Sequence, residues 1–222
     1  MRSQQSGFTL VEIAIVLVII GLLLGGILKG QELINSAKVK NIANDFRVIP
    51  TYIYAYQDKF KSLPGDDAQV VAHVTGATLS TTGPVGNGVV NGAWNSTTAT
   101  DESFLFWQHV RLANLASGPT AVADPGYIPV NATGGVIGIS SATSTSTQIV
   151  GMKGTYQICS SGILGKFAKQ LDIQMDDGNT ATGSMQTTAE PATGIDKAAV
   201  PNNTAPPTGI DDASSYTVCM TF

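Results

Sequence analysis

A run of 21 uninterrupted, mostly apolar residues, from Phe8 to Leu28, constrains this chain of 222 residues more than any other feature. At 1.5 Å per residue, a helix of this length spans about 31 Å, which matches the hydrocarbon core of a bilayer. Glu12 is its one charged residue. A single carboxylate near the end of the run opposes insertion by less than the other side chains favour it. The sequence therefore predicts a transmembrane helix over residues 8–28.

Glu12 itself needs an explanation, because an ionisable side chain within a membrane span marks a functional site and needs a partner. One interpretation is that Glu12 only reaches the membrane surface from the end of the helix. The residues before it suggest another. A short polar stretch with one basic residue, Arg2, ends at Gly7 and leads into the sequence G-F-T-L-V-E (7–12).

This sequence resembles the cleavage and methylation motif of type IV prepilins and of the related pseudopilins of type II secretion. The resemblance implies that residues 1–7 are a leader peptide, which a prepilin peptidase removes after Gly7. The same enzyme would methylate the new amino terminus at Phe8. Glu12, fifth in the mature chain, would then meet the Phe8 amine of a neighbouring subunit during assembly, although the spacing also permits a contact within one chain.

Apolar side chains spaced by three and four continue the helical pattern beyond the span. They are Val39, Ile42, Phe46, Ile49, Ile53, Tyr56 and Phe60. The pattern predicts one helix over residues 8–61 with an apolar half and an amphipathic half, ended by S-L-P-G-D-D (62–67). Pro50 should kink it. Four glycines at 21–30 indicate either close packing of membrane helices or a segment that unwinds, as the resemblance implies.

Residues 62–222 contain the patterns of a globular head. Residues 102–115 and 163–174 have the apolar spacing of short helices. Four short β-type runs occur at 134–140, 147–153, 155–161 and 215–221. Together with the long N-terminal helix, these elements predict an α+β fold in which the helix packs on a small antiparallel sheet.

The two cysteines, Cys159 and Cys219, lie too far apart for a C-x-x-C zinc or thioredoxin-like site. If the chain leaves the cytoplasm, a disulfide between them is the natural interpretation. It would close a loop of about 60 residues, for which the chain-entropy model gives about 4 kcal/mol of stabilisation. Two buried free thiols are the alternative.

The head contains no recognisable catalytic or cofactor-binding motif. His73 and His109 are the chain's two histidines, and neither belongs to an H-E-x-x-H sequence. No G-x-S-x-G sequence and no phosphate-binding loop occurs. The net charge of −7 over residues 62–222 argues against a broad nucleic-acid-binding surface. The sequence therefore predicts no enzyme, no cofactor and no nucleic-acid partner.

The densest group of oxygen ligands lies at Asp172, Asp176, Asp177 and Asn179. Its spacing does not match an EF-hand loop, and a turn is the simplest interpretation. The resemblance leaves a calcium site as an alternative here, because some pseudopilins bind calcium in a loop of the head. We assign no metal ligands from the sequence.

The resemblance implies a non-enzymatic subunit, a major or minor pilin of a type IV pilus-like filament. Its partners would be copies of itself, related pilins, the prepilin peptidase and the assembly machinery of the bacterial inner membrane. It would cross that membrane once and then enter a surface filament or a periplasmic pseudopilus. A pseudopilin of type II secretion is the alternative. A periplasmic enzyme or binding protein, with residues 8–28 as a plain anchor, is a third hypothesis.

Overall fold

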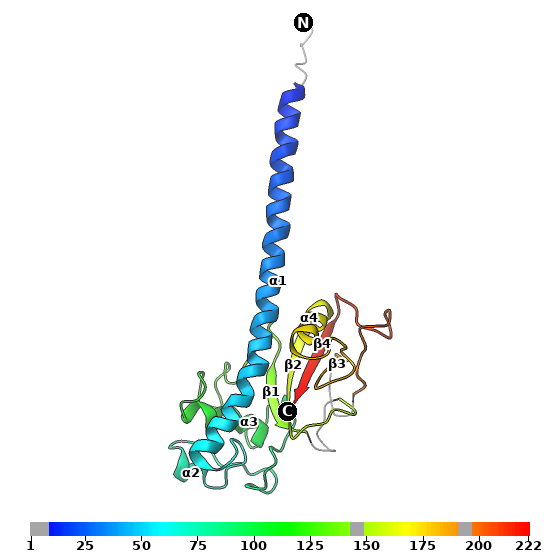
Figure 1. Ribbon diagram of the computed structural model, residues 1–222. Helices are drawn as coiled ribbons and strands as arrows, with labels where there is room; N and C mark the ends of the chain where they lie inside the picture. Colours follow the sequence, from blue (N-terminus) through cyan, green and yellow to red (C-terminus); the bar gives the residue numbers. More distant parts are fainter. Residues whose placement is uncertain (1–8, 143–148, 191–196) are drawn as a thin grey trace. The chain divides into compact units, whose positions relative to one another are not determined.

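The computed structural model describes residues 9–142, 149–190 and 197–222 (Figure 1). The chain divides into two compact units, which we call the first unit, Met1–Lys38, and the second unit, Val39–Phe222. Over the described residues, the structure contains a long helix, three short helices and a four-stranded antiparallel sheet. The expected α+β fold is therefore confirmed.

The long helix, α1, begins at Leu10 and ends at Phe60. In the first unit, all of its residues from Leu10 to Lys29 are exposed, because no other described part of that unit covers them. The helix continues through all four glycines between Gly21 and Gly30. A Cβ added at any of them would meet no neighbouring atom. No neighbour within the described chain therefore requires these glycines.

In the second unit, α1 buries one stripe of side chains, as its apolar spacing predicts. The buried residues are Val39, Ile42, Ala43, Phe46, Ile49, Ile53 and Tyr56. The helix continues through Pro50, so this residue does not end it. Proline lacks the N–H group that would bond to the carbonyl four residues earlier. The hydroxyl of the next residue, Thr51, donates to the Val48 carbonyl at 2.6 Å.

The sheet has the strand order β1-β2-β4-β3, and each neighbouring pair is antiparallel. Its strands are β1 (Ile137–Ser141), β2 (Tyr156–Leu164), β3 (Met185–Ala189) and β4 (Ser215–Thr221). The last strand of the chain therefore lies between β2 and β3 (Figure 1). Cys159 on β2 stands directly opposite Cys219 on β4, and a disulfide joins them, which confirms the pairing expected from the sequence.

Three short helices accompany the sheet. They are α2 (Val70–His73), α3 (Glu102–Leu112) and α4 (Gly165–Met175). α3 contacts β1, and α4 contacts β2, β3 and β4. The buried stripe of α1 joins both helices and the sheet in one hydrophobic core, in which Phe46, Phe106, Ile158 and Val218 are fully buried. Because its large apolar side chains come from distant parts of the sequence, this core holds the loops of the second unit in place.

Two strand expectations differ from the structure. In the run at 147–153, residues 147 and 148 lie outside the described residues, and the rest is a turn in which Ile149 makes an isolated bridge to Lys197. This prediction is wrong, because the Gly151 turn breaks the run. Conversely, the sequence M-Q-T-T-A (185–189) forms β3, although it lacks the alternation of apolar and polar residues on which strand prediction depends.

Candidate functional site

Thr9 and Glu12 form a reciprocal pair of hydrogen bonds at the start of α1. The Thr9 N–H and the Thr9 hydroxyl donate to Oε2 of Glu12, at 2.8 and 2.7 Å. The Glu12 N–H donates in turn to the Thr9 hydroxyl oxygen at 3.3 Å. This arrangement is a capping box, which satisfies two N–H groups that the first turn of a helix leaves unpaired. Glu12 therefore has a partner within its own chain.

The other oxygen of this carboxylate, Oε1, makes no hydrogen bond to any described residue. Gly7 and Phe8, the expected cleavage and methylation residues, lie outside the described residues. In this cap, Oε2 of Glu12 accepts hydrogen bonds from Thr9, and Oε1 is left for another partner.

Among the described residues, α1 is the one helix that is long and apolar enough to cross a membrane. Its most apolar stretch of 18 residues has a mean hydropathy of 2.8 and no residue buried within the chain. Length and composition thus agree with the span predicted from the sequence.

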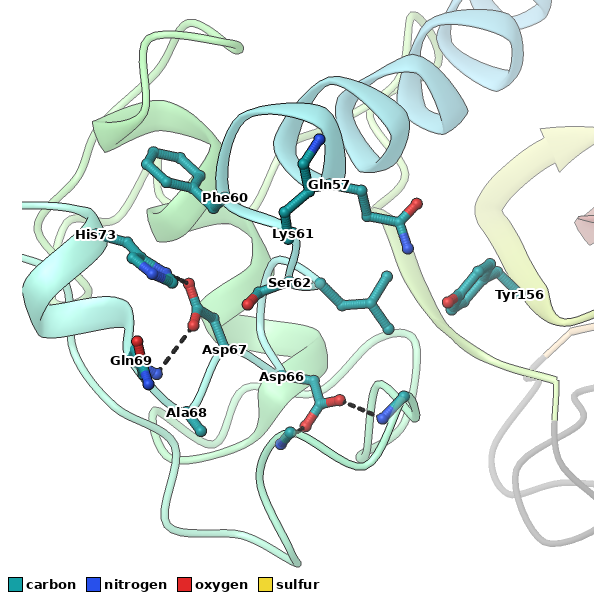
Figure 2. Close-up of a pocket in the computed structure, with 13 residues that line it drawn as sticks. Gln57, Phe60, Lys61, Ser62, Asp66, Asp67, Ala68, Gln69, His73 and Tyr156 are labelled. Carbon is teal, nitrogen blue, oxygen red and sulfur yellow. Dashed lines mark hydrogen bonds and ion pairs between the residues drawn. The ribbon is translucent and has the colours of Figure 1, made fainter.

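A polar cleft of about 580 Å³ lies in the second unit, where α1 ends (Figure 2). The helix stops at Phe60, and Lys61 takes a left-handed conformation with φ of 56°. The turn that follows needs a glycine at Gly65, where φ is +90° and a Cβ would collide with the backbone carbonyl of Glu102. The sequence L-P-G-D-D therefore reverses the chain against the start of α3.

Asp67, the second acid of this turn, is fully buried and holds three donors. Its Oδ2 accepts from the Tyr56 hydroxyl at 2.9 Å and from Nδ1 of His73 at 2.7 Å, and its Oδ1 accepts from the Gln69 N–H at 2.9 Å. Burial raises the pKa of Asp67, but the hydrogen bonds from His73, Gln69 and Tyr56 outweigh it, and the net pKa lies below its usual value. Asp67 is therefore an ionised carboxylate that fixes His73 at the cleft wall.

Asp66, the first acid, binds a separate loop. Its Oδ1 accepts from the N–H groups of Gly86 and of Asn87, the latter at 3.3 Å, and its Oδ2 accepts from Gly88 N–H at 2.6 Å. Both glycines have φ of +83°, a conformation that other residues rarely adopt. One carboxylate thus attaches the 86–88 loop to the end of α1 (Figure 2).

His109 binds the same turn from α3. Its Nδ1 accepts from the Gly65 N–H and its Nε2 donates to the Thr78 carbonyl, both at 2.9 Å. Burial is the main influence on this imidazole and lowers its pKa. His109 is therefore a neutral residue of the core that links α3 to the turn.

The comparison with family models concerns the N-terminal segment. Residues 2–28 match the model described as the prokaryotic N-terminal methylation motif. The chain carries the hallmark of type IV pilins and pseudopilins. No curated protein and no solved structure matches it.

The methylation motif includes Gly7, Phe8 and Glu12, and it ends at the last residue of the predicted span. It supports membership of the type IV pilin and pseudopilin family in general, whose members are structural subunits. The motif and the apolar helix also agree with membrane anchoring before assembly. None of the cleft residues lies within the motif.

The acidic group at 172–179 is held mostly by its own turn. Asp176 accepts from the Met185 N–H at 2.7 Å, and Asp177 accepts from Thr182 and from the Asn179 N–H. Asp172 is fully buried, and neither of its oxygens has a hydrogen-bond partner among the described residues. Burial first, then the nearby charges of Asp177 and Asp176, raise the pKa of Asp172 to about 7, against a smaller lowering influence of the Gly178 backbone. No group of three or more potential ligands in the described part of the chain is placed to hold a metal ion.

Sequence reasoning missed two features of these sites. The T-x-x-E spacing of Thr9 and Glu12 is the signature of a capping box, so the partner of Glu12 could have been found. The role of His73 could not, because its contact with Asp67 depends on how the turn after α1 folds.

Proposed function

We propose that this chain is a non-enzymatic subunit, a major or minor pilin, of a type IV pilus-like filament. The observation that carries the proposal is the methylation motif at residues 2–28, with Glu12 five residues after the expected cleavage site. Prepilin peptidase removes residues 1–7 and methylates Phe8. The exposed apolar surface of α1 in the first unit then changes its surroundings from lipid to the same helix of neighbouring subunits.

The capping geometry supports separate roles for the two oxygens of the Glu12 carboxylate. Oε2 stays on Thr9 and keeps the first turn helical, while Oε1 accepts from the Phe8 ammonium of a neighbouring subunit. In a medium of low dielectric constant, an unpaired charge is strongly unfavourable and a nearby opposite charge recovers much of that loss. The pair therefore sets the axial position at which a new subunit joins.

A pseudopilin of a type II secretion system is the alternative, because the same motif occurs in both groups. Pilins form long surface filaments, whereas pseudopilins form a short periplasmic structure. Electron microscopy of filaments sheared from the native cells, followed by mass spectrometry of their protein, distinguishes the two. Finding this chain as a component of surface filaments supports the pilin assignment.

The mass of the mature N-terminal peptide tests the processing route. We expect a peptide that begins at Phe8 and carries one methyl group on its amine. A chain purified from its own host with Met1–Gly7 still attached contradicts the proposal. It would instead support the third hypothesis, an envelope protein for which residues 8–28 are a plain anchor.

A further inference from the structure

The cleft of the second unit has the size of a ligand site, and the proposed assembly role does not use it. Its volume of about 580 Å³ lies within the range of small-molecule sites. Three separate stretches line it. They are the end of α1 with the turn after it, the loop that contains Gly86 and Gly88, and Tyr156 at the start of β2 (Figure 2).

The walls of the cleft are fixed by hydrogen bonds within the protein. Asp66 attaches the 86–88 loop, and Asp67 holds His73 and the Gln69 backbone. The ring of Phe60 stacks on that of His73, with 5.4 Å between the ring centroids. A site whose walls are already ordered loses less conformational entropy when a ligand binds.

Several polar groups at the surface of this cleft make no hydrogen bond within the described residues. They are the side-chain amides of Gln57 and Gln69, the hydroxyls of Ser62 and Tyr156, and Nε2 of His73. Amides and hydroxyls both donate and accept, and Nε2 of His73 is the ring nitrogen that Asp67 does not bind. Such a mixture matches a ligand that itself carries many groups able to donate and accept.

Two half-buried aromatic rings, Phe60 and Tyr156, complete the lining. Figure 2 shows the Gln57 side chain extending from the end of α1 toward the Tyr156 ring. An aromatic ring beside polar groups suits a ligand that has a C–H face and a hydroxyl edge. Sugar rings have both.

The charged groups at the cleft argue against a charged ligand. The carboxylates of Asp66 and Asp67 would repel an anion, and their oxygens already accept from N–H and O–H donors. Lys61 directs its ammonium to Asp58, donating to the backbone carbonyl at 2.7 Å and to the carboxylate at 3.3 Å. Apart from Lys61 and His73, the groups left for a ligand are therefore uncharged.

We propose that this cleft binds a neutral, hydroxyl-rich ligand, a sugar of one or two rings. Gln57, Ser62 and Gln69 bond to its hydroxyl groups. Tyr156 contributes its ring to the C–H face and its hydroxyl to the edge. The filament subunit would thereby carry a carbohydrate site in its second unit.

Ligand-observed NMR on the full mature chain, in a zwitterionic detergent without a sugar headgroup, tests this proposal. The probes are the methyl glycosides of glucose, galactose, mannose and N-acetylglucosamine, titrated into the tens of millimolar. We expect at least one to bind, and Gln57→Ala and Tyr156→Phe each to weaken it by about 3–10-fold, the effect of one lost hydrogen bond. Gln170→Ala and Tyr52→Phe, which change the same residue types away from the cleft, should bind like the unmodified chain.

Absence of binding by all four glycosides overturns the proposal, and so does binding that the double variant Gln57→Ala, Tyr156→Phe leaves unchanged. Circular dichroism confirms that each variant keeps its fold. Both substitutions lie outside the methylation motif, so processing and assembly should continue in them. Loss of sugar binding and loss of assembly are thus separate results, and each can fail without the other.

Discussion

Two parts of α1 differ in whether their apolar side chains are buried within the chain. From Leu10 to Lys29, α1 is apolar on all sides apart from Glu12 and Lys29, and every residue is exposed. From Val39 to Tyr56, it is apolar along one stripe, and that stripe is buried. The second part packs against other described residues of the chain, whereas no described residue covers the first. A helix that is hydrophobic all round must be covered by lipid or by other helices, and Glu12 lies in this uncovered part.

Replacement of Glu12 should give the largest effect. If Oε1 pairs with an ammonium in the filament, Glu12→Ala leaves a buried ion unpaired, at about 3–5 kcal/mol, or more than about 100-fold in the assembly equilibrium. Sheared filaments, quantified by immunoblot and electron microscopy, measure it. Membrane insertion and cleavage after Gly7 should persist.

Glu12→Gln separates the charge from the helix cap, because a glutamine oxygen can still accept from Thr9. We expect it to assemble as poorly as Glu12→Ala. Glu32→Ala is the matched control, since Glu32 is an exposed acid of the same helix that pairs with Lys29. Normal filaments from Glu12→Gln would mean that capping, not charge, is what assembly needs.

Removal of the disulfide should destabilise the second unit without affecting the first. The bridge closes 60 residues, so the double variant Cys159→Ala, Cys219→Ala should lower the free energy of unfolding by about 4 kcal/mol. Both tryptophans, Trp94 and Trp107, are buried in the second unit, so their fluorescence reports its unfolding. Membrane insertion of the same variant should match that of the unmodified chain.

One substitution made in both parts of α1 tests the comparison directly. Ile53 is fully buried, whereas Ile19 is 51 % exposed. Ile53→Ala should destabilise the second unit by about 3 kcal/mol, within the range of 2–5 for a buried aliphatic truncation. Ile19→Ala should leave the fluorescence-detected transition unchanged. Equal effects would show that the two parts do not differ as described.

The smallest effect concerns pH. Glu102, buried at the start of α3, has its pKa raised from 4.5 to about 7, first by burial and also by Asp66 and Asp101, against hydrogen bonds from Asn91. The folded state then binds more protons than the unfolded state between these values. Stability from this group is complete below about pH 4.5 and is lost as the pH rises through 7.

Glu102→Gln should therefore flatten the decline of stability between about pH 4.5 and 7, by about 1–3 kcal/mol. Denaturant titrations followed by tryptophan fluorescence measure the change. Glu32→Gln, in the exposed first unit, should leave the pH profile as it is. A profile for Glu102→Gln that still declines over this range would assign the effect to another group, such as Asp172, whose pKa is also raised to about 7.

Local patterns predicted the parts of this protein whose structure depends on near neighbours. The span follows from a continuous apolar run, and the buried stripe at 39–56 follows from spacings of three and four. The helix at 102–112 and the strands that carry Cys159 and Cys219 were found in the same way. β3 was missed because its threonines are buried by the sheet and not by a pattern of their own.

The cleft depends on contacts between residues far apart in the sequence. L-P-G-D-D signalled the end of a helix, but nothing in it indicates that Asp66 binds the backbone of residues 86–88 or that Gly65 rests on Glu102. A turn sequence indicates that the chain reverses direction, whereas packing of the core determines which residues the reversed chain contacts.

The sequence by itself determined the motif, the membrane-length helix and the position of its single acid, because these depend on residue type and spacing along one helix. Only the tertiary structure decided which polar groups stay free for a ligand, since a hydrogen bond satisfied across the fold removes a group from use. Glu12 stands between the two cases. Its spacing from Gly7 is visible in the sequence, while the structure shows that its Oε2 already accepts hydrogen bonds from Thr9.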